Sequence, residues 1–254
     1  MVKSQQILNN FKKNIIMRAF ITTFFLIILV GTACTYEGKI IEGNGKITSE
    51  KRTVNNISKI KVEGSIEVVI DNGLEGARIV TDENLIPYIV TEKDGDLLKI
   101  KVKENANLKS TKPITVYLST PLVTEINLAG SGNVVANGRF SSTDRMGFEI
   151  AGSGNITIDV NSPKITTNIS GSGTVHITGE TKVVNVQIAG SGTHDGFALK
   201  AEDVSVKIAG SGDAMVYADI NLKVSIAGSG NIKYKGNATV DKNITGSGDV
   251  IKEP

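Results

Sequence analysis

Apolar and polar residues alternate along most of the chain after Lys46, and in the second half this alternation recurs at a nearly fixed interval. Aliphatic side chains stand at every second position, with polar side chains between them. A period of two is typical of a β-strand with one buried face. The second half shows no helical periodicity. The pattern therefore predicts an all-β chain.

The strands are separated by the triplet Gly-Ser-Gly, which occurs seven times. The first glycines of successive triplets are 22, 19, 19, 20, 18 and 18 residues apart. An aliphatic residue stands two positions before each triplet, and Asn, Thr or Asp follows it directly. A corner that needs positive φ or close backbone approach favours glycine. We therefore predict the following structural corners: Gly130, Gly132, Gly152, Gly154, Gly171, Gly173, Gly190, Gly192, Gly210, Gly212, Gly228, Gly230, Gly246 and Gly248.

A repeat of this length fits one coil of a single-stranded parallel β-helix, a β-solenoid in which each strand pairs with its equivalent one coil on. Connections between parallel strands are expected to be right-handed. We assign residues 126–254 to the β-helix repeats. Residues 46–125 have less regular strands, turns at Asp71-Asn72-Gly73 and Lys93-Asp94-Gly95, and Pro87 in an irregular stretch. We expect this N-terminal β region to cap the solenoid.

A glycine-rich triplet can also belong to a phosphate-binding loop or to a calcium-binding repeat. Glycine-rich loops can cradle phosphate, but one phosphate site needs one loop, and nucleotide motifs need a longer glycine spacing before a helix. Calcium-binding repeats need an aspartate in nearly every repeat and a nine-residue period. Here only Asp213 and Asp249 follow a triplet directly, and the period is twice as long. Both interpretations fit less well than a structural corner.

The first 33 residues have the composition of a secretory signal peptide. They contain Lys3, Lys12, Lys13 and Arg18 and no acid, and an apolar stretch runs over residues 19–30. That stretch is short for a membrane span. Met17, just before the apolar stretch, is an alternative start to Met1.

The signal ends at Gly31-Thr32-Ala33-Cys34, which resembles the lipobox of bacterial lipoproteins, although Gly31 stands where leucine is usual. The resemblance implies lipidation of Cys34, the only cysteine, and a lipid-anchored tether over residues 34–45. The expected location is the cell envelope, as an exported outer-membrane lipoprotein. Without the signal, which holds four of the 28 basic residues, the chain has 24 basic and 26 acidic side chains. A net charge of −2 and few aromatic residues give nucleic-acid binding no support.

β-Helices can also carry enzyme sites, which need clustered acids or bases on one outward face. Asp195, Asp213 and the pair Glu202-Asp203 are the acids that could approach one another, but exposed surface charge is the simpler interpretation. His176 and His194 stand at different offsets from their triplets and should face opposite sides of the sheet, which disfavours a shared metal site. Ser131 and its equivalents have no histidine base. We predict no catalytic, cofactor or metal site.

Several segments together resemble the head GIN domain family, which is labelled as auto-transporter adhesins. They are Arg52-Thr53-Val54, residues 57–60, residues 62–68, Glu83-Asn84-Leu85, Leu98-Lys99-Ile100 and residues 128–132, followed by the later triplets. The resemblance covers residues 45 to 254. It implies a secreted or lipid-anchored β-helical protein of gram-negative bacteria, and it implies no established activity.

The combined prediction is a non-catalytic, lipid-anchored β-solenoid that acts as an adhesin or surface-binding module. Its partners would be the membrane, through the lipid, and a polysaccharide, a host surface or an envelope protein. An oligomer through the exposed C-terminal coil is also allowed. One alternative is a periplasm-facing structural or envelope-sensing lipoprotein, and a further one is a carbohydrate-active enzyme.

Overall fold

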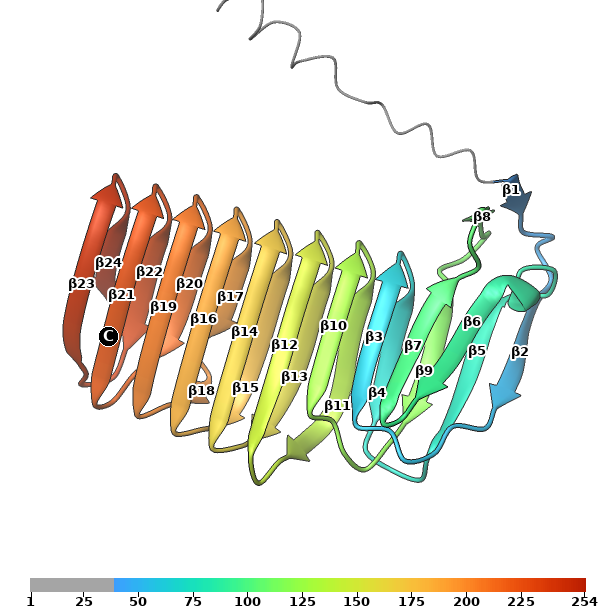
Figure 1. Ribbon diagram of the computed structural model, residues 1–254, viewed down its shortest axis with the longest axis horizontal. Coiled ribbons are helices and arrows are strands. Elements are labelled where there is room, and N and C mark those ends of the chain that lie inside the picture. The colour runs from blue at the N-terminus through green and yellow to red at the C-terminus, as the bar shows by residue number, and fades with distance from the viewer. Residues whose placement is uncertain (1–38) are drawn as a thin grey trace, which may run out of the picture. The chain divides into compact units, whose positions relative to one another are not determined.

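The computed structural model describes residues 39–254. The predicted signal peptide, the start at Met17 and the lipidation site Cys34 lie outside the described residues. The described chain is built almost entirely of β-strands, with one 3₁₀ turn, η1 (Ile86–Tyr88), at the irregular stretch around Pro87. Figure 1 shows these strands stacked in two layers. The all-β solenoid predicted from the alternation is confirmed.

Two large sheets form the layers, and a small third sheet lies at the N-terminal end. The first large sheet has ten strands, in the order β23 (Thr239–Gly246), β21 (Asn221–Gly228), β19 (Asp203–Gly210), β16 (Val183–Gly190), β14 (Lys164–Gly171), β12 (Arg145–Gly152), β10 (Glu125–Gly130), β3 (Lys59–Gly64), β7 (Leu97–Val102) and β6 (Ile89–Asp94). The second has twelve: β2 (Ile47–Arg52), β5 (Gly76–Asp82), β9 (Thr115–Ser119), β4 (Glu67–Asp71), β11 (Asn133–Ser141), β13 (Asn155–Asn161), β15 (Thr174–Glu180), β17 (Thr193–Gly196), β20 (Asp213–Tyr217), β22 (Asn231–Lys235) and β24 (Asp249–Lys252), with β18 (Leu199–Lys200) beside β15. The third pairs β1 (Lys39–Glu42) with β8 (Ala106–Lys109).

The aliphatic residue before each triplet forms a continuous ladder inside the solenoid. Equivalent strands pair in parallel and in register, so these residues stack directly from coil to coil: Val62, Leu128, Ile150, Ile169, Ile188, Ile208, Ile226 and Ile244. All except Ile244, in the last coil, are buried. Burying an aliphatic side chain contributes about 1.5–3 kcal/mol. The ladder is therefore a major part of the core between the two sheets.

The triplets form the corners that carry the chain from the ten-stranded sheet to the twelve-stranded one. The first glycine of every triplet has φ between +120° and +135°, a region that L side chains rarely adopt. A Cβ on any of these glycines would collide with the carbonyl oxygen of the equivalent glycine in the preceding coil. At the third position, a Cβ on Gly192 would lie 2.5 Å from Cγ2 of Ile169. The middle serine is exposed, and the backbone N–H of Ser191 donates to the carbonyl oxygen of Gly171 at 2.9 Å.

The stack of coils begins before residue 126, where the sequence predicts that the repeats start. Its first coil is formed by β3 and β4. β3 and β4 lie in register with β10 and β11, and Gly64 lies opposite Gly130. The corner of this coil is Gly64-Ser65-Ile66, so a buried isoleucine stands where the later corners have their third glycine. Because of this isoleucine, the Gly-Ser-Gly pattern does not reveal the coil in the sequence.

The cap is made by β2 and by the segment between β4 and β10, which leaves the stack and returns to it. β7 and β9 extend the two sheets by one more parallel rung beyond β3 and β4. The outermost strands are antiparallel: β6 pairs with β7, while β5 pairs with both β9 and β2. Polar and charged residues such as Glu50 and Lys51 stand on the edge strand β2. A charged edge strand limits edge-to-edge association.

The end of the predicted tether is part of the folded domain. Lys39–Glu42 form β1, and the buried carboxylate of Asp82 holds the residues that follow. Asp82 accepts hydrogen bonds from the backbone N–H of Gly45 at 2.7 Å and from the backbone and side chain of Thr111 at 2.9 and 2.8 Å. Burial alone would raise the pKa of Asp82, but these hydrogen bonds outweigh it and the pKa is lowered. Residues 39–45, which the sequence assigned to the tether, are therefore ordered against the folded domain.

Candidate functional site

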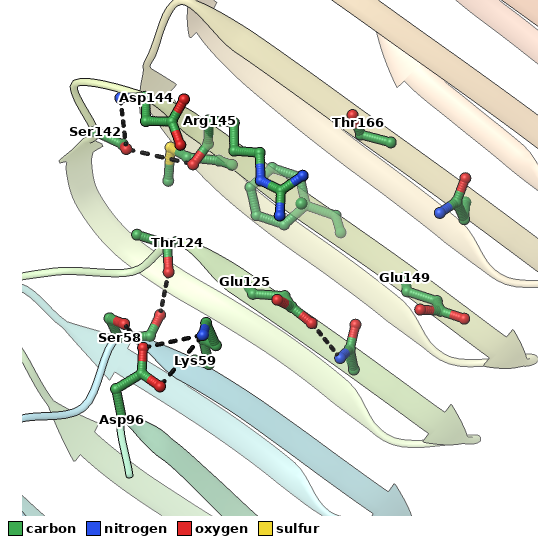
Figure 2. A pocket seen from close by; sticks show the side chains of 15 residues that line it. Ser58, Lys59, Asp96, Thr124, Glu125, Ser142, Asp144, Arg145, Glu149 and Thr166 are labelled. Carbon is green, nitrogen blue, oxygen red and sulfur yellow. Dashed lines mark hydrogen bonds and ion pairs between the residues drawn. The ribbon is translucent and has the colours of Figure 1, made fainter.

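A depression on the described surface lies on the outer face of the ten-stranded sheet, near the cap. It has a volume of about 480 Å³ and spans β3, β10, β12 and β14. Figure 2 shows the side chains of Glu125, Arg145 and Glu149 along its length, with Asp96 and Lys59 at the end nearer the cap. Outward positions of the alternating strands supply these groups, so the core ladder beneath them sets their spacing.

The floor of this depression is Gly147, in the middle of β12. Its neighbours in register on the adjacent strands are Glu125 and Thr166, which both carry side chains. Unlike the first glycine of each triplet, Gly147 does not have positive φ, and the nearest atom to a Cβ built there is Cγ of Glu125, at 3.9 Å. The backbone therefore does not require glycine at this position. Glycine inside a strand often marks a place where another molecule approaches closely.

The polar groups around the depression are partly fixed by one another. Asp96 accepts a hydrogen bond from the hydroxyl of Ser58 at 2.7 Å and pairs with Lys59 at 3.2 Å. These contacts lower the pKa of Asp96, so it is a carboxylate at neutral pH. Glu125 accepts from Nδ2 of Asn127 at 2.7 Å. Arg145 and Glu149 have no side-chain hydrogen bond or ion pair with the described residues, so both are available to a ligand.

The stretch of chain from the start of β11 to Arg145, where β12 begins, is longer than the equivalent stretches in the following coils. The pairing of β11 with β13 shifts register between Val135 and Arg139, and Gly138 there has φ of +83°. This irregularity adds two residues to the 22-residue first step between triplets, and the loop over residues 142–144 adds one more. The loop after β11 is held by Ser142, whose hydroxyl donates to the carbonyl oxygen of Arg145 at 3.3 Å and accepts from the N–H of Asp144 at 3.3 Å.

A second depression, of about 510 Å³, continues from the first along the same face. Glu149 and Asn168 line both depressions, and the second extends across β16 and β19 to β21. Its lining combines a row of polar side chains with a parallel row of small ones, which are Ser170, Ala189, Ala209 and Ala227. We refer to the two depressions together as the polar groove. It follows the stacking direction across seven strands, from β3 to β21.

The acids singled out from the sequence are not brought together. Asp195 lies on the outer face of the twelve-stranded sheet, where its Oδ2 is 2.9 Å from Nδ1 of His176. Asp213, one coil on, accepts from the backbone N–H of Asn231 at 2.9 Å. Asp203 belongs to the other sheet and accepts from Nδ2 of Asn221 at 2.7 Å, and Glu202 is exposed beside it. Among residues 39–254, no group of three His, Cys, Asp or Glu side chains could hold a metal ion.

The two histidines face opposite sides of the twelve-stranded sheet, as their offsets predict. His176 is half-buried on the outer face, whereas His194 is completely buried in the core, between Val175 and Ala214 in register. Neither ring nitrogen of His194 has a hydrogen-bond partner within the described part of the chain. Burial lowers the pKa of His194 to about 4, so the ring is neutral at physiological pH.

The polar groove was not predicted from the sequence, although two signals pointed to it. Gly147 interrupts an otherwise alternating strand at an outward position, and the first step between triplets is the longest. The structure describes no helix long and apolar enough to cross a membrane. A two-sheet parallel β-solenoid with one open polar face is the class of protein that these features define.

Comparison with known proteins agrees with this class. The profile of the family described as "Putative auto-transporter adhesin, head GIN domain" matches residues 56–238. The chain belongs to the head GIN domain family, as its sequence motifs indicate. No match was found among curated proteins.

Solved structures from Parabacteroides and Bacteroides species share the fold. A "putative lipid binding protein" from Parabacteroides distasonis is 27% identical, with a TM-score of 0.72, and the match covers 85% of this chain and 100% of that one. A "putative adhesin" from Parabacteroides merdae is 25% identical, with a TM-score of 0.69, and the match covers 85% and 99% of the two chains. A "putative adhesin" from Bacteroides fragilis is 20% identical, with a TM-score of 0.78, and the match covers 84% of this chain and 100% of that one. At this identity the likeness supports the fold alone.

Proposed function

We propose that this protein is the lipid-anchored binding head of an adhesin on the cell surface and that it acts without catalysis. The observation that carries the proposal is the polar groove, a continuous hydrogen-bonding surface across seven strands of a rigid solenoid. Family membership supports an adhesive role. Asp195, Asp203 and Asp213 each have a separate hydrogen-bond partner and His194 is buried, which supports binding in preference to acid–base chemistry.

The proposed anchor is a lipid on Cys34, and it would hold the cap end near the membrane. Only four residues separate Cys34 from Lys39, where β1 begins, and an extended chain spans at most about 3.6 Å per residue. The anchor would therefore reach Lys39 within about 18 Å. The hydrogen bonds of Asp82 with the backbone of Gly45 and Thr111 hold the residues after β1 in place, so those residues do not lengthen the link to the anchor. The polar groove would then run from near the membrane towards the distal coils.

Deletion of the gene in the native bacterium, followed by complementation, tests this function. We expect the deletion strain to adhere less to mucin-coated plates and the wild-type gene to restore adhesion. Cys34→Ala should release the protein from the membrane fraction and fail to restore adhesion.

Unchanged adhesion of the deletion strain would contradict the adhesin role. Unchanged adhesion together with a crosslinked protein partner in the envelope would favour the periplasmic alternative. A Cys34→Ala protein that stays in the membrane fraction would contradict the lipid anchor alone.

A further inference from the structure

The polar groove has a composition that selects among ligand classes. Its first depression is lined by four acids, Asp96, Glu125, Asp144 and Glu149, and by two bases, Lys59 and Arg145, a net charge of −2. The second contains Glu149 and Lys207 as its only charged side chains. A nucleic acid or another polyanion needs a positive surface, which neither depression offers.

The groove also lacks the groups on which protein partners usually depend. Protein interfaces are enriched in aromatic residues, Met and Arg at their centres. The only aromatic side chain lining the groove is that of Phe148, which is buried, and Met146 is buried too. The exposed groups are amides, hydroxyls, carboxylates, lysine, one guanidinium and alanine methyls. This set suits a neutral ligand with many hydroxyl groups.

The groove is long, so a ligand that fills it must be extended. Successive strands lie about 4.8 Å apart, so seven strands span about 29 Å along the stack. Equivalent outward positions recur at every coil, because the strands pair in register. A ligand that meets the same kind of group at each step is a polymer, and a flexible polymer can follow a shallow surface of this kind.

We propose that the polar groove binds an extended, uncharged glycan chain, with Gly147 as the floor of its main subsite. The missing side chain at Gly147 lets a sugar ring reach the sheet surface between Glu125 and Thr166. Arg145 and Glu149 lie on either side of that space and donate to and accept from the sugar hydroxyls. Asn168 continues the contacts into the second depression. This inference rests on the proposed function and names its ligand class.

The test measures binding of the full chain, purified in detergent, to an array of immobilised polysaccharides. The probes are dextran, galactomannan and desialylated mucin glycans as uncharged chains, and hyaluronan and heparin as anionic ones. We expect binding to at least one uncharged probe, with longer chains bound more tightly than short oligosaccharides. Gly147→Thr, which installs the residue found at the neighbouring position 166, should weaken binding at least ten-fold and leave the melting temperature equal or higher.

Ser205→Thr is the matched control, because Ser205 lies three coils along the same outward row, outside both depressions. It should bind as the wild type does. Asn168→Ala serves as a second test of the groove should Gly147→Thr fold poorly, and it should also weaken binding several-fold.

Three results would overturn the inference. Unchanged binding by folded Gly147→Thr, or by Asn168→Ala where the first variant is misfolded, would reject the groove as the site. Binding to anionic probes alone, or to none, would reject an uncharged glycan. If no probe binds while the deletion strain still loses adhesion, the adhesin role stands and its ligand is of another class, such as a protein.

Discussion

Gly130 and Gly64 lie opposite each other in adjacent strands, although the whole cap separates them along the chain. The two glycines bring the backbones together at the first corner, where a Cβ on Gly130 would collide with the carbonyl oxygen of Gly64. The first repeat after the cap therefore stacks on a coil made much earlier in the chain. This contact joins the cap and the repeats into one continuous solenoid.

Gly130→Ala should destabilise the protein because alanine at φ of +128° is strained and its methyl group meets the backbone of β3. Strained backbone costs about 1–3 kcal/mol, and the collision adds to that. Gly147→Ala is the control, because φ and space there are ordinary. It should be neutral or stabilising by up to about 1 kcal/mol. Urea unfolding of both variants measures the difference, and equal effects would mean that the corner does not require glycine.

The two faces of β16 can be compared at adjacent positions. Ile188 is buried in the aliphatic ladder, with 2% of its surface exposed, whereas Gln187 points outward beside Asn168 and Lys207. Ile188→Asp places a carboxylate in the core, which costs several kcal/mol and should unfold the repeats. Gln187→Asp should leave the melting temperature within a few degrees of wild type. Similar thermal melts for the two variants would contradict the assignment of faces.

The buried His194 should make stability depend on pH. Its pKa is about 4 in the folded protein and about 6.5 when unfolded, so between these values the unfolded state binds more protons. Stability is then full above about pH 6.5 and falls as the pH drops towards 4, by about 3 kcal/mol over that window. His194→Val, which copies Val175 in the preceding coil, should remove this dependence. Urea unfolding at pH 7.5 and 4.5 tests it, and an unchanged pH profile in the variant would reject the assignment.

The last coil carries two lysines at positions that face the core in earlier coils. Lys242 is in register with the buried Val224, and Lys252 with the half-buried Tyr234. Inward-pointing charges on an edge strand oppose further strand addition. These lysines therefore argue against the oligomer that the sequence allowed through the C-terminal coil.

Lys242→Val combined with Lys252→Val should promote end-to-end association, because it leaves an apolar edge in both sheets. Light scattering across a concentration series would show the rise in mass. Lys223→Val, on the exposed outer face, is the control and should stay monomeric. A wild-type protein that already dimerises, with Lys242 and Lys252 in the interface, would contradict this account.

The sequence predicted the repeated part of the fold well because its strands obey one local rule. The residue two positions before the triplet, such as Ile188, is buried in every coil but the last. The first glycine of each triplet has positive φ, and the third leaves no room for a Cβ. The cap was less predictable. Its strand order depends on long-range pairing between β3 and β10, and Ile66 replaces the glycine that would have marked the coil.

The candidate site was largely invisible in the sequence for a different physical reason. Lys59, Glu125 and Arg145 are far apart in the chain and become neighbours only through the register of β3, β10 and β12. Each looks like an ordinary exposed charge when seen alone. Gly147 and the long first step between triplets were the local signs, and alternation alone did not distinguish Gly147 from other strand residues.

The most direct test of the central claim is to label intact cells with a membrane-impermeant amine reagent and to compare this protein with a known periplasmic protein. Lys207 and Lys223 are exposed on the outer face and should react if the solenoid is displayed outside the cell. The account predicts labelling of this protein while the periplasmic control stays unlabelled. Labelling only after the outer membrane has been opened would contradict surface display and favour an envelope-facing role.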